Sequence, residues 1–129
     1  MSGVQGLWVF VAGGVGSVAR WLVSLGCLAA FGPIFPVGTL TVNLVGCFLI
    51  AALFEAAVST DKISAALRVT LASGFLGGFT TYSAFSNELF TYFRDGALGL
   101  AAAYLIVTVL GCLATCLLGQ LAARWWIGL

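Results

Sequence analysis

Four long apolar stretches, separated by short polar turns, run along the chain. They cover about residues 4–31, 37–58, 62–93 and 97–126. Each is long enough for the ~20 residues with which an α-helix crosses a hydrocarbon core of about 30 Å. The turns between them contain residues that end helices, such as Pro33, Pro36 and Gly96. The pattern predicts an all-α membrane protein with four transmembrane helices in a single domain, residues 1–129.

The third stretch differs from the others at its centre. Residues 73–83 are rich in glycine and in hydroxyl side chains at the depth of the bilayer midplane. Glycine lets the backbone leave helical geometry, and unpaired peptide groups are tolerated in a bilayer only where protein, water or ions satisfy them. We therefore expect a broken third helix, with the break near residues 74–81. The alternative is that Gly74, Gly77 and Gly78 simply allow a neighbouring helix to pack closely.

The composition supports an integral membrane protein over a water-soluble one. Of the 129 residues, 62% are hydrophobic and 7% are charged, which is too little polar surface to coat a soluble globule of this size. Membrane lipid is therefore the expected surrounding. The five Lys and Arg residues and the four Asp and Glu residues leave a net charge of +1. No basic face is available for a nucleic-acid backbone, so no nucleic-acid partner is expected.

The chain offers little catalytic or metal-binding chemistry. It has no histidine, and its four cysteines, Cys27, Cys47, Cys112 and Cys116, fall inside apolar stretches without a CxxC spacing. We interpret them as small packing residues. The sequence shows no carboxylate pair, no nucleophile beside a base and no phosphate-binding loop, so it does not indicate an enzyme.

Polar side chains inside the stretches recur at helical spacing, which is typical of residues that face other helices. They predict a narrow polar track made of Thr39 and Asn43, of Thr80, Thr81, Ser83, Ser86 and Asn87, and of Tyr104, Thr108, Cys112 and Thr115. A single Ser or Thr hydroxyl often bonds back to a carbonyl of its own helix, so each has a structural alternative. The Asn43 amide has more donors and acceptors than one such bond satisfies. That excess favours a partner helix or a bound species.

The few charged residues give further expectations. Arg20 lies deep in the first stretch, where burial costs several kcal/mol unless the guanidinium is hydrated or paired, so we expect a wet vestibule or a polar partner. Glu55 and Glu88 are expected near solvated helix ends. The bias of Lys and Arg toward one end is weak, which suggests insertion in both orientations and an antiparallel dimer. Four short helices enclose little space, so a permeation path needs a second subunit.

Three motifs resemble those of the Fluc (CrcB-type) fluoride channel family. Residues 74–88, GFLGGFTTYSAFSNE, resemble the family signature GxxGGFTTFSTFSxE. Residues 38–46, GTLTVNLVG, resemble GTLxVNxxG, and residues 13–21, GGVGSVARW, resemble GGxxGAxxRY of the first span. Length and number of spans agree as well, so the resemblance covers essentially the whole chain.

The resemblance implies passive export of cytoplasmic fluoride across the cell inner membrane of a bacterium. It implies a dual-topology antiparallel homodimer with two pores at the subunit interface and a central structural sodium ion. The fluoride pore would involve Asn43, Tyr82, Phe85, Tyr104, Thr108, Ser83 and Thr39, with Arg20 in a vestibule. The backbone carbonyls of Gly77 and Thr80 from both subunits would hold the sodium ion. Carbonyls at an unwound segment suit such a hard cation.

Three positions depart from the family pattern, and two other functions stay open. Tyr82 replaces a phenylalanine of the signature, which is expected to lower or alter conductance, while Thr108 replaces a serine and Ala84 a threonine. One alternative function is a small proton-coupled multidrug exporter of organic cations, which needs a membrane-buried carboxylate that the first stretch lacks. The other is a non-conducting scaffold subunit, in which the faces of small residues are packing surfaces.

Overall fold

The protein is all-helical over residues 2–129, the part of the chain that the computed structural model describes. Three long helices, α1 (Gly3–Phe31), α2 (Val37–Ser59) and α6 (Leu98–Ile127), are each apolar and long enough to cross a membrane, which makes this a multi-pass membrane protein. A further pass along the bundle is built from shorter pieces. These are α3 (Ala65–Val69), the π-helix η1 (Thr70–Leu76), α4 (Gly77–Phe79) and α5 (Tyr82–Arg94).

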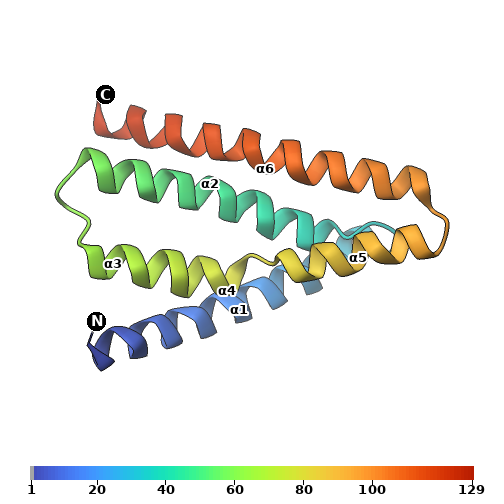
Figure 1. The fold of residues 1–129 in the computed structure, drawn as a ribbon, viewed down its shortest axis with the longest axis horizontal. Coiled ribbons are helices and arrows are strands. Elements are labelled where there is room, and N and C mark those ends of the chain that lie inside the picture. The colour runs from blue at the N-terminus through green and yellow to red at the C-terminus, as the bar shows by residue number, and fades with distance from the viewer. Residues whose placement is uncertain (1) are drawn as a thin grey trace.

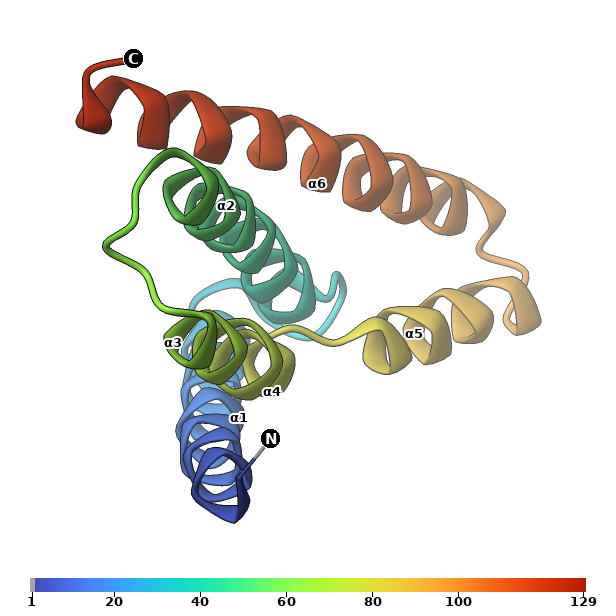
Figure 2. The same ribbon diagram turned by 60° about the vertical axis from the view of Figure 1, so that its left-hand side comes forward.

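Successive passes run in opposite directions, so both ends of the described chain lie at the same end of the bundle (Figure 1). α2 packs against α6, whereas α1 packs against η1 and α4 (Figure 2). Gly32 ends α1 with a φ of +77°, a conformation that favours glycine, and Pro33 follows it. The junction between α4 and α5 lies near the middle of the bundle's length (Figure 1).

The interior of the bundle is small, and many large apolar side chains face outward. Val42 and Tyr104 are the largest fully buried side chains. Phe10, Leu113 and Trp126 are examples of the exposed apolar ones. Patches of this kind are a liability in water but are the ordinary surface of helices in lipid.

Gly74 and Gly78 of the third pass serve close packing, whereas a Cβ on Gly77 would meet only the Ala72 carbonyl oxygen of its own pass, at 3.7 Å. Residues 74–78 remain helical. A Cβ on Gly78 would collide with the carbonyl oxygen of Gly13 in α1, and a Cβ on Gly16 of α1 would collide with the carbonyl oxygen of Phe75. Without a Cβ at Gly16 and Gly78, the two helix backbones can come together. For Gly78 this is the alternative that the sequence left open, in which glycine allows a neighbouring helix to pack closely.

The backbone leaves helical geometry at Thr80 and Thr81, just after the glycines. Both residues are extended, with φ −89° and ψ 160° at Thr80 and φ −152° and ψ 111° at Thr81. The N–H and the hydroxyl of Thr80 both donate to the Leu76 carbonyl, each at 2.9 Å. The Thr81 hydroxyl accepts from the Ala84 N–H at 3.2 Å and caps the start of α5. Two threonine hydroxyls thus close the two helix ends that meet here.

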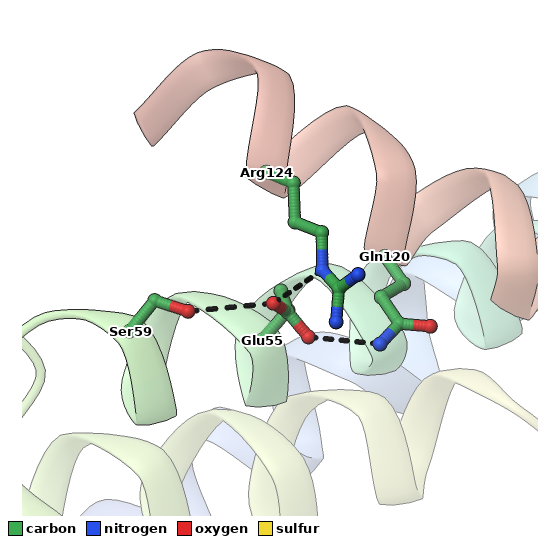
Figure 3. Close-up of polar contacts among 4 residues, drawn as sticks. All are labelled: Glu55, Ser59, Gln120 and Arg124. Carbon is green, nitrogen blue, oxygen red and sulfur yellow. Dashed lines mark hydrogen bonds and ion pairs between the residues drawn. The ribbon is translucent and has the colours of Figure 1, made fainter. Parts of the chain in front are cut away.

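A polar cluster joins α2 to α6 at the end of the bundle that holds the C-terminus (Figure 3). The Glu55 carboxylate accepts hydrogen bonds from Arg124 Nε at 2.7 Å, Gln120 Nε2 at 3.0 Å and the Ser59 hydroxyl at 3.3 Å. Glu55 lies near a helix end, as expected, and α6 also places an arginine and an amide opposite it. The Arg124 side chain is half exposed, so the ion pair itself adds about 0–1 kcal/mol. The cluster mainly fixes how the two helices align.

Gly16→Ala is expected to destabilise the protein by about 1–3 kcal/mol, because the new Cβ must push α1 away from the backbone of Phe75 and Phe79. Unfolding in detergent micelles, followed by tryptophan fluorescence, measures the change. Gly14→Ala is the matched control, since a Cβ there meets nothing within 4 Å. Equal stability of the two variants would contradict the close approach of α1 to the third pass.

Candidate functional site

A groove of about 540 Å³ is bordered by α2, α6 and the interrupted third pass. Six of the ten residues that the sequence assigns to a pore or a sodium site line it, namely Asn43, Gly77, Thr80, Tyr82, Phe85 and Thr108. The rest of its lining consists of glycine, aliphatic side chains and the thiols of three cysteines. No charged side chain of the described residues lines the groove.

Side chains of α1 and α2 bond the peptide groups around the interruption. The Asn43 amide pairs with the backbone of Thr81: Oδ1 accepts from the Thr81 N–H at 2.8 Å, and Nδ2 donates to the Thr81 carbonyl at 3.1 Å. Arg20 Nε donates to the Gly78 carbonyl at 2.9 Å. Arg20 therefore has a polar partner, one of the two environments expected for it, and it does not line the groove.

The Thr108 hydroxyl is a polar group of the groove that is left unsatisfied. Thr108 is 6% exposed, and its Oγ1 has no hydrogen-bond partner within residues 2–129. A buried hydroxyl without a partner costs about 1–3 kcal/mol, so its presence calls for a physical reason. Thr115, further along the same helix, donates to the Cys112 carbonyl at 3.1 Å. This is the bond to a carbonyl of its own helix that the sequence allowed as the structural alternative. The polar face of α6 thus leaves one hydroxyl free to bind something else.

Aromatic rings lead from the rim of the groove into the bundle. The ring centroids of Tyr82 and Phe85 are 6.0 Å apart and those of Phe85 and Tyr104 are 5.0 Å apart, both in edge-to-face arrangements. Tyr82 is 80% exposed at the start of α5, whereas Phe85 and Tyr104 are buried. Ser83 is exposed beside Tyr82, and its hydroxyl lies 3.3 Å from that of Thr81. The edges of such rings carry partial positive charge, which suits an anion.

The half-buried Glu88 carboxylate lies at the end of the bundle where α2 begins and has partners within the chain. Glu88 Oε1 accepts from the Thr39 hydroxyl at 2.8 Å, and Oε2 accepts from the Tyr104 hydroxyl at 2.7 Å. Glu88 therefore lies near a helix end, as expected, but it also has partners within the chain because it follows the buried Phe85 by three residues, which puts both on one face of α5. That spacing was the signal in the sequence. Thr39 and Glu88 also line a second cavity of about 270 Å³.

Backbone carbonyls are the groups of this site that suit a metal ion. Among residues 2–129, no group of three His, Cys, Asp or Glu side chains is arranged to hold one. The carbonyls of Gly78 and Thr81 accept side-chain hydrogen bonds, whereas those of Gly77 and Thr80 accept none in the described part of the chain. Neutral carbonyl oxygens are the kind of ligand that a hard cation takes. The carbonyl oxygens of Gly77 and Thr80 are therefore of the type that binds a sodium ion. One copy of the chain supplies only two of them, which is fewer than such an ion needs.

Thr108→Val is expected to leave the free energy of unfolding unchanged, or to raise it by up to about 1 kcal/mol, because the removed hydroxyl has no partner among the described residues. Thr39→Val is the matched control. It deprives one Glu88 oxygen of its 2.8 Å hydrogen bond and should cost about 1–3 kcal/mol. Denaturation of the purified variants in detergent measures both. A loss at Thr108→Val as large as that at Thr39→Val would show that the Thr108 hydroxyl is bonded within the folded chain.

Comparison with known proteins gives the family. Residues 7–120 match the family described as CrcB-like protein, Camphor Resistance (CrcB). The fluoride-specific ion channel FluC of Anaeromyxobacter dehalogenans is 48% identical over 122 residues, which cover 95% of this chain and 97% of that protein. Proteins of the same name from Chlorobium chlorochromatii and Geobacter sulfurreducens are each 46% identical, over 95% and 92% of this chain and 94% and 95% of their own lengths. With its sequence matched from the first helix to the last, the chain belongs to the CrcB family.

Proposed function

We propose that this protein is a fluoride channel of a bacterial inner membrane, through which cytoplasmic fluoride leaves the cell passively. Its relatives named fluoride-specific ion channels support this, since they are similar over nearly the whole chain. In the structure, one observation carries the proposal. Within residues 2–129 the buried Thr108 hydroxyl has no partner and lines a groove without charged side chains, so it offers a neutral donor to an anion that has lost water.

Fluoride is small and holds its water strongly, so a path for it must replace that water with hydrogen-bond donors and other positive partial charges. The Thr108 hydroxyl is one donor, and the second N–H of the Asn43 amide is another. The ring edges of Phe85 and Tyr82 and the N-terminus of α5 add partial positive charge. Neutral groups bind an anion weakly enough for it to leave again, which conduction requires.

The remaining pore residues extend this path. In the proposal Tyr104 and Thr39 continue the polar track from the groove toward Glu88, to which both donate. Ser83 contributes its exposed hydroxyl at the start of α5. Arg20 lies in the vestibule that leads to the interruption, and its charge favours the approach of anions.

A second copy of the chain covers the groove in this proposal. Tyr82 at the rim is 80% exposed. One copy of the chain forms only one wall of the groove, and the second copy forms the other. The chain carries only five Lys and Arg residues, so its orientation is weakly specified and the two copies are antiparallel. A two-fold axis between them makes the contact self-complementary and creates two equivalent paths.

The same two-fold axis completes the sodium site of the proposal. The Gly77 and Thr80 carbonyls of one copy supply two oxygens, and the same carbonyls of the second copy supply two more. Bound there, the ion would neutralise carbonyl dipoles at the interruption and join the two copies. The four transmembrane spans, with the third one interrupted at Thr80 and Thr81, belong to this assembly.

The hydrogen-bonded Glu88 is the one feature that favours the proton-coupled exporter instead. Such a transporter needs a carboxylate within the membrane, and Glu88 meets its partners inside the bundle. Its hydrogen bonds to two hydroxyls make it a fixed part of the scaffold in the channel proposal. The dependence of transport on a proton gradient separates the two functions.

Purified protein in liposomes loaded with potassium fluoride is expected to release fluoride when valinomycin carries the balancing potassium. A fluoride electrode follows the release. Potassium chloride liposomes, read with a chloride electrode, should release no more than protein-free ones, and an imposed pH gradient should leave the fluoride rate unchanged. Fluoride release no faster than from protein-free liposomes would contradict the proposed function.

Two substitutions test the groove in the same assay. Thr108→Val should slow fluoride release about tenfold or more, because a hydrogen bond to a charged group contributes about 1.5–3 kcal/mol and about 1.4 kcal/mol is a factor of ten in rate. Tyr82→Phe should preserve or raise the rate, since it restores the ring of the family signature without the hydroxyl. Thr91→Val is the control, as the Thr91 hydroxyl bonds back to the Asn87 carbonyl on α5. An unchanged rate for Thr108→Val would remove this hydroxyl from the path.

A further inference from the structure

The interruption at Thr80 and Thr81 exposes peptide groups that a continuous helix would pair. In the core of a bilayer each unpaired N–H or C=O costs several kcal/mol. Local groups satisfy part of this need, since Thr80 donates twice to the Leu76 carbonyl and the Thr81 hydroxyl caps α5. The N–H and the carbonyl of Thr81 and the carbonyl of Gly78 are bonded by side chains from elsewhere in the chain.

Asn43 satisfies both peptide groups of Thr81 with one amide. The bonds are 2.8 Å and 3.1 Å long and join residues 38 positions apart. Turning the amide by 180° would set its NH₂ against the Thr81 N–H and its oxygen against the Thr81 carbonyl, so only one orientation is allowed. The amide keeps one N–H that Thr81 does not use, and Asn43 lines the groove. The bonds to Thr81 therefore also fix where that N–H lies.

Arg20 bonds the other side of the interruption. Its Nε donates to the Gly78 carbonyl over a separation of 58 positions. Close packing brings α1 within reach, because Gly78 lies directly against Gly13 and Ser17 of that helix. A guanidinium inside the membrane needs such a polar partner, and a carbonyl at the end of a helix is a suitable one.

We infer that Arg20 and Asn43 are positioning residues of the interruption, which hold the Gly78 carbonyl and the Thr81 peptide groups by hydrogen bonds. They leave the carbonyls of Gly77 and Thr80 unbonded and set the free N–H of Asn43 at the groove. The contacts do not depend on what the protein transports. Their effect on fluoride release rests on the proposed function.

The contacts can be measured in the unmodified protein. Solid-state NMR of uniformly ¹³C,¹⁵N-labelled protein in lipid bilayers should show ¹⁵N–¹³C through-space correlations from Arg20 Nε to the Gly78 carbonyl carbon and from Asn43 Nδ2 to that of Thr81. Gln5 Nε2, which donates to the Ala66 carbonyl at 3.1 Å, provides the matched reference. A Gln5 correlation without the other two would overturn the inference.

Substitutions of Arg20 separate a hydrogen bond from a charge. In glutamine, Nε2 is as many bonds from Cα as Nε is in arginine, so Arg20→Gln keeps the donor and removes the charge. Met has the same length without a donor. Both variants lack the charge, so any difference between them reports on the hydrogen bond, and fluoride release should be about tenfold or more slower for Arg20→Met than for Arg20→Gln. Equal rates for the two variants would overturn the role given to Arg20.

Asn43→Asp tests the second contact in the same way. The carboxylate still accepts from the Thr81 N–H but opposes the Thr81 carbonyl, so the Thr81 carbonyl ¹³C shift should change and fluoride release should fall tenfold or more. Gln5→Met is the control and should leave both unchanged. An unaltered Thr81 shift would overturn the role of Asn43. Absence of fluoride release from the unmodified protein would contradict the proposed function alone, because the NMR contacts would stand.

Discussion

Inside a bilayer every peptide N–H and carbonyl needs a hydrogen-bond partner. At Thr80 and Thr81 the backbone is extended, so side chains must bond the peptide groups that a continuous helix would pair. Threonine hydroxyls close the two helix ends, and side chains of α1 and α2 bond what remains. The conformation of the interruption is therefore fixed by hydrogen bonds from α1, from α2 and from threonines of the third pass itself. Its geometry depends on the helices that surround it.

Close packing of α1 against the third pass makes these bonds possible. Gly16 on one helix and Gly78 on the other let two backbones touch, and a Cβ at either position would collide with backbone of the facing helix. Arg20 lies one turn beyond this contact and reaches the Gly78 carbonyl from there. The glycines thus bring α1 close to the third pass, and the long Arg20 side chain forms the hydrogen bond between them.

Charge is kept off the groove. Arg20 bonds a carbonyl, Glu88 accepts from two hydroxyls, and Glu55 is paired with groups of α6 at the end of the bundle. In the described part of the chain the groove is left with neutral groups, among them a Thr108 hydroxyl without a hydrogen-bond partner. A fixed cation there would bind an anion tightly, whereas neutral donors bind and release it, and this difference matters to a conducting path.

The sequence by itself determined the helical class, the approximate ends of the helices and the residue types of the groove, because long apolar runs, turn residues and helical spacing are local signals. It did not determine at which residues of the expected range 74–81 the third pass leaves helical geometry, since the Thr80 and Thr81 conformation depends on bonds from distant helices. It also did not reveal the partners of Glu88, which lie 49 and 16 positions away. Such pairings are decided only when helices pack, because a side chain's partner follows from three-dimensional proximity and not from its neighbours along the chain.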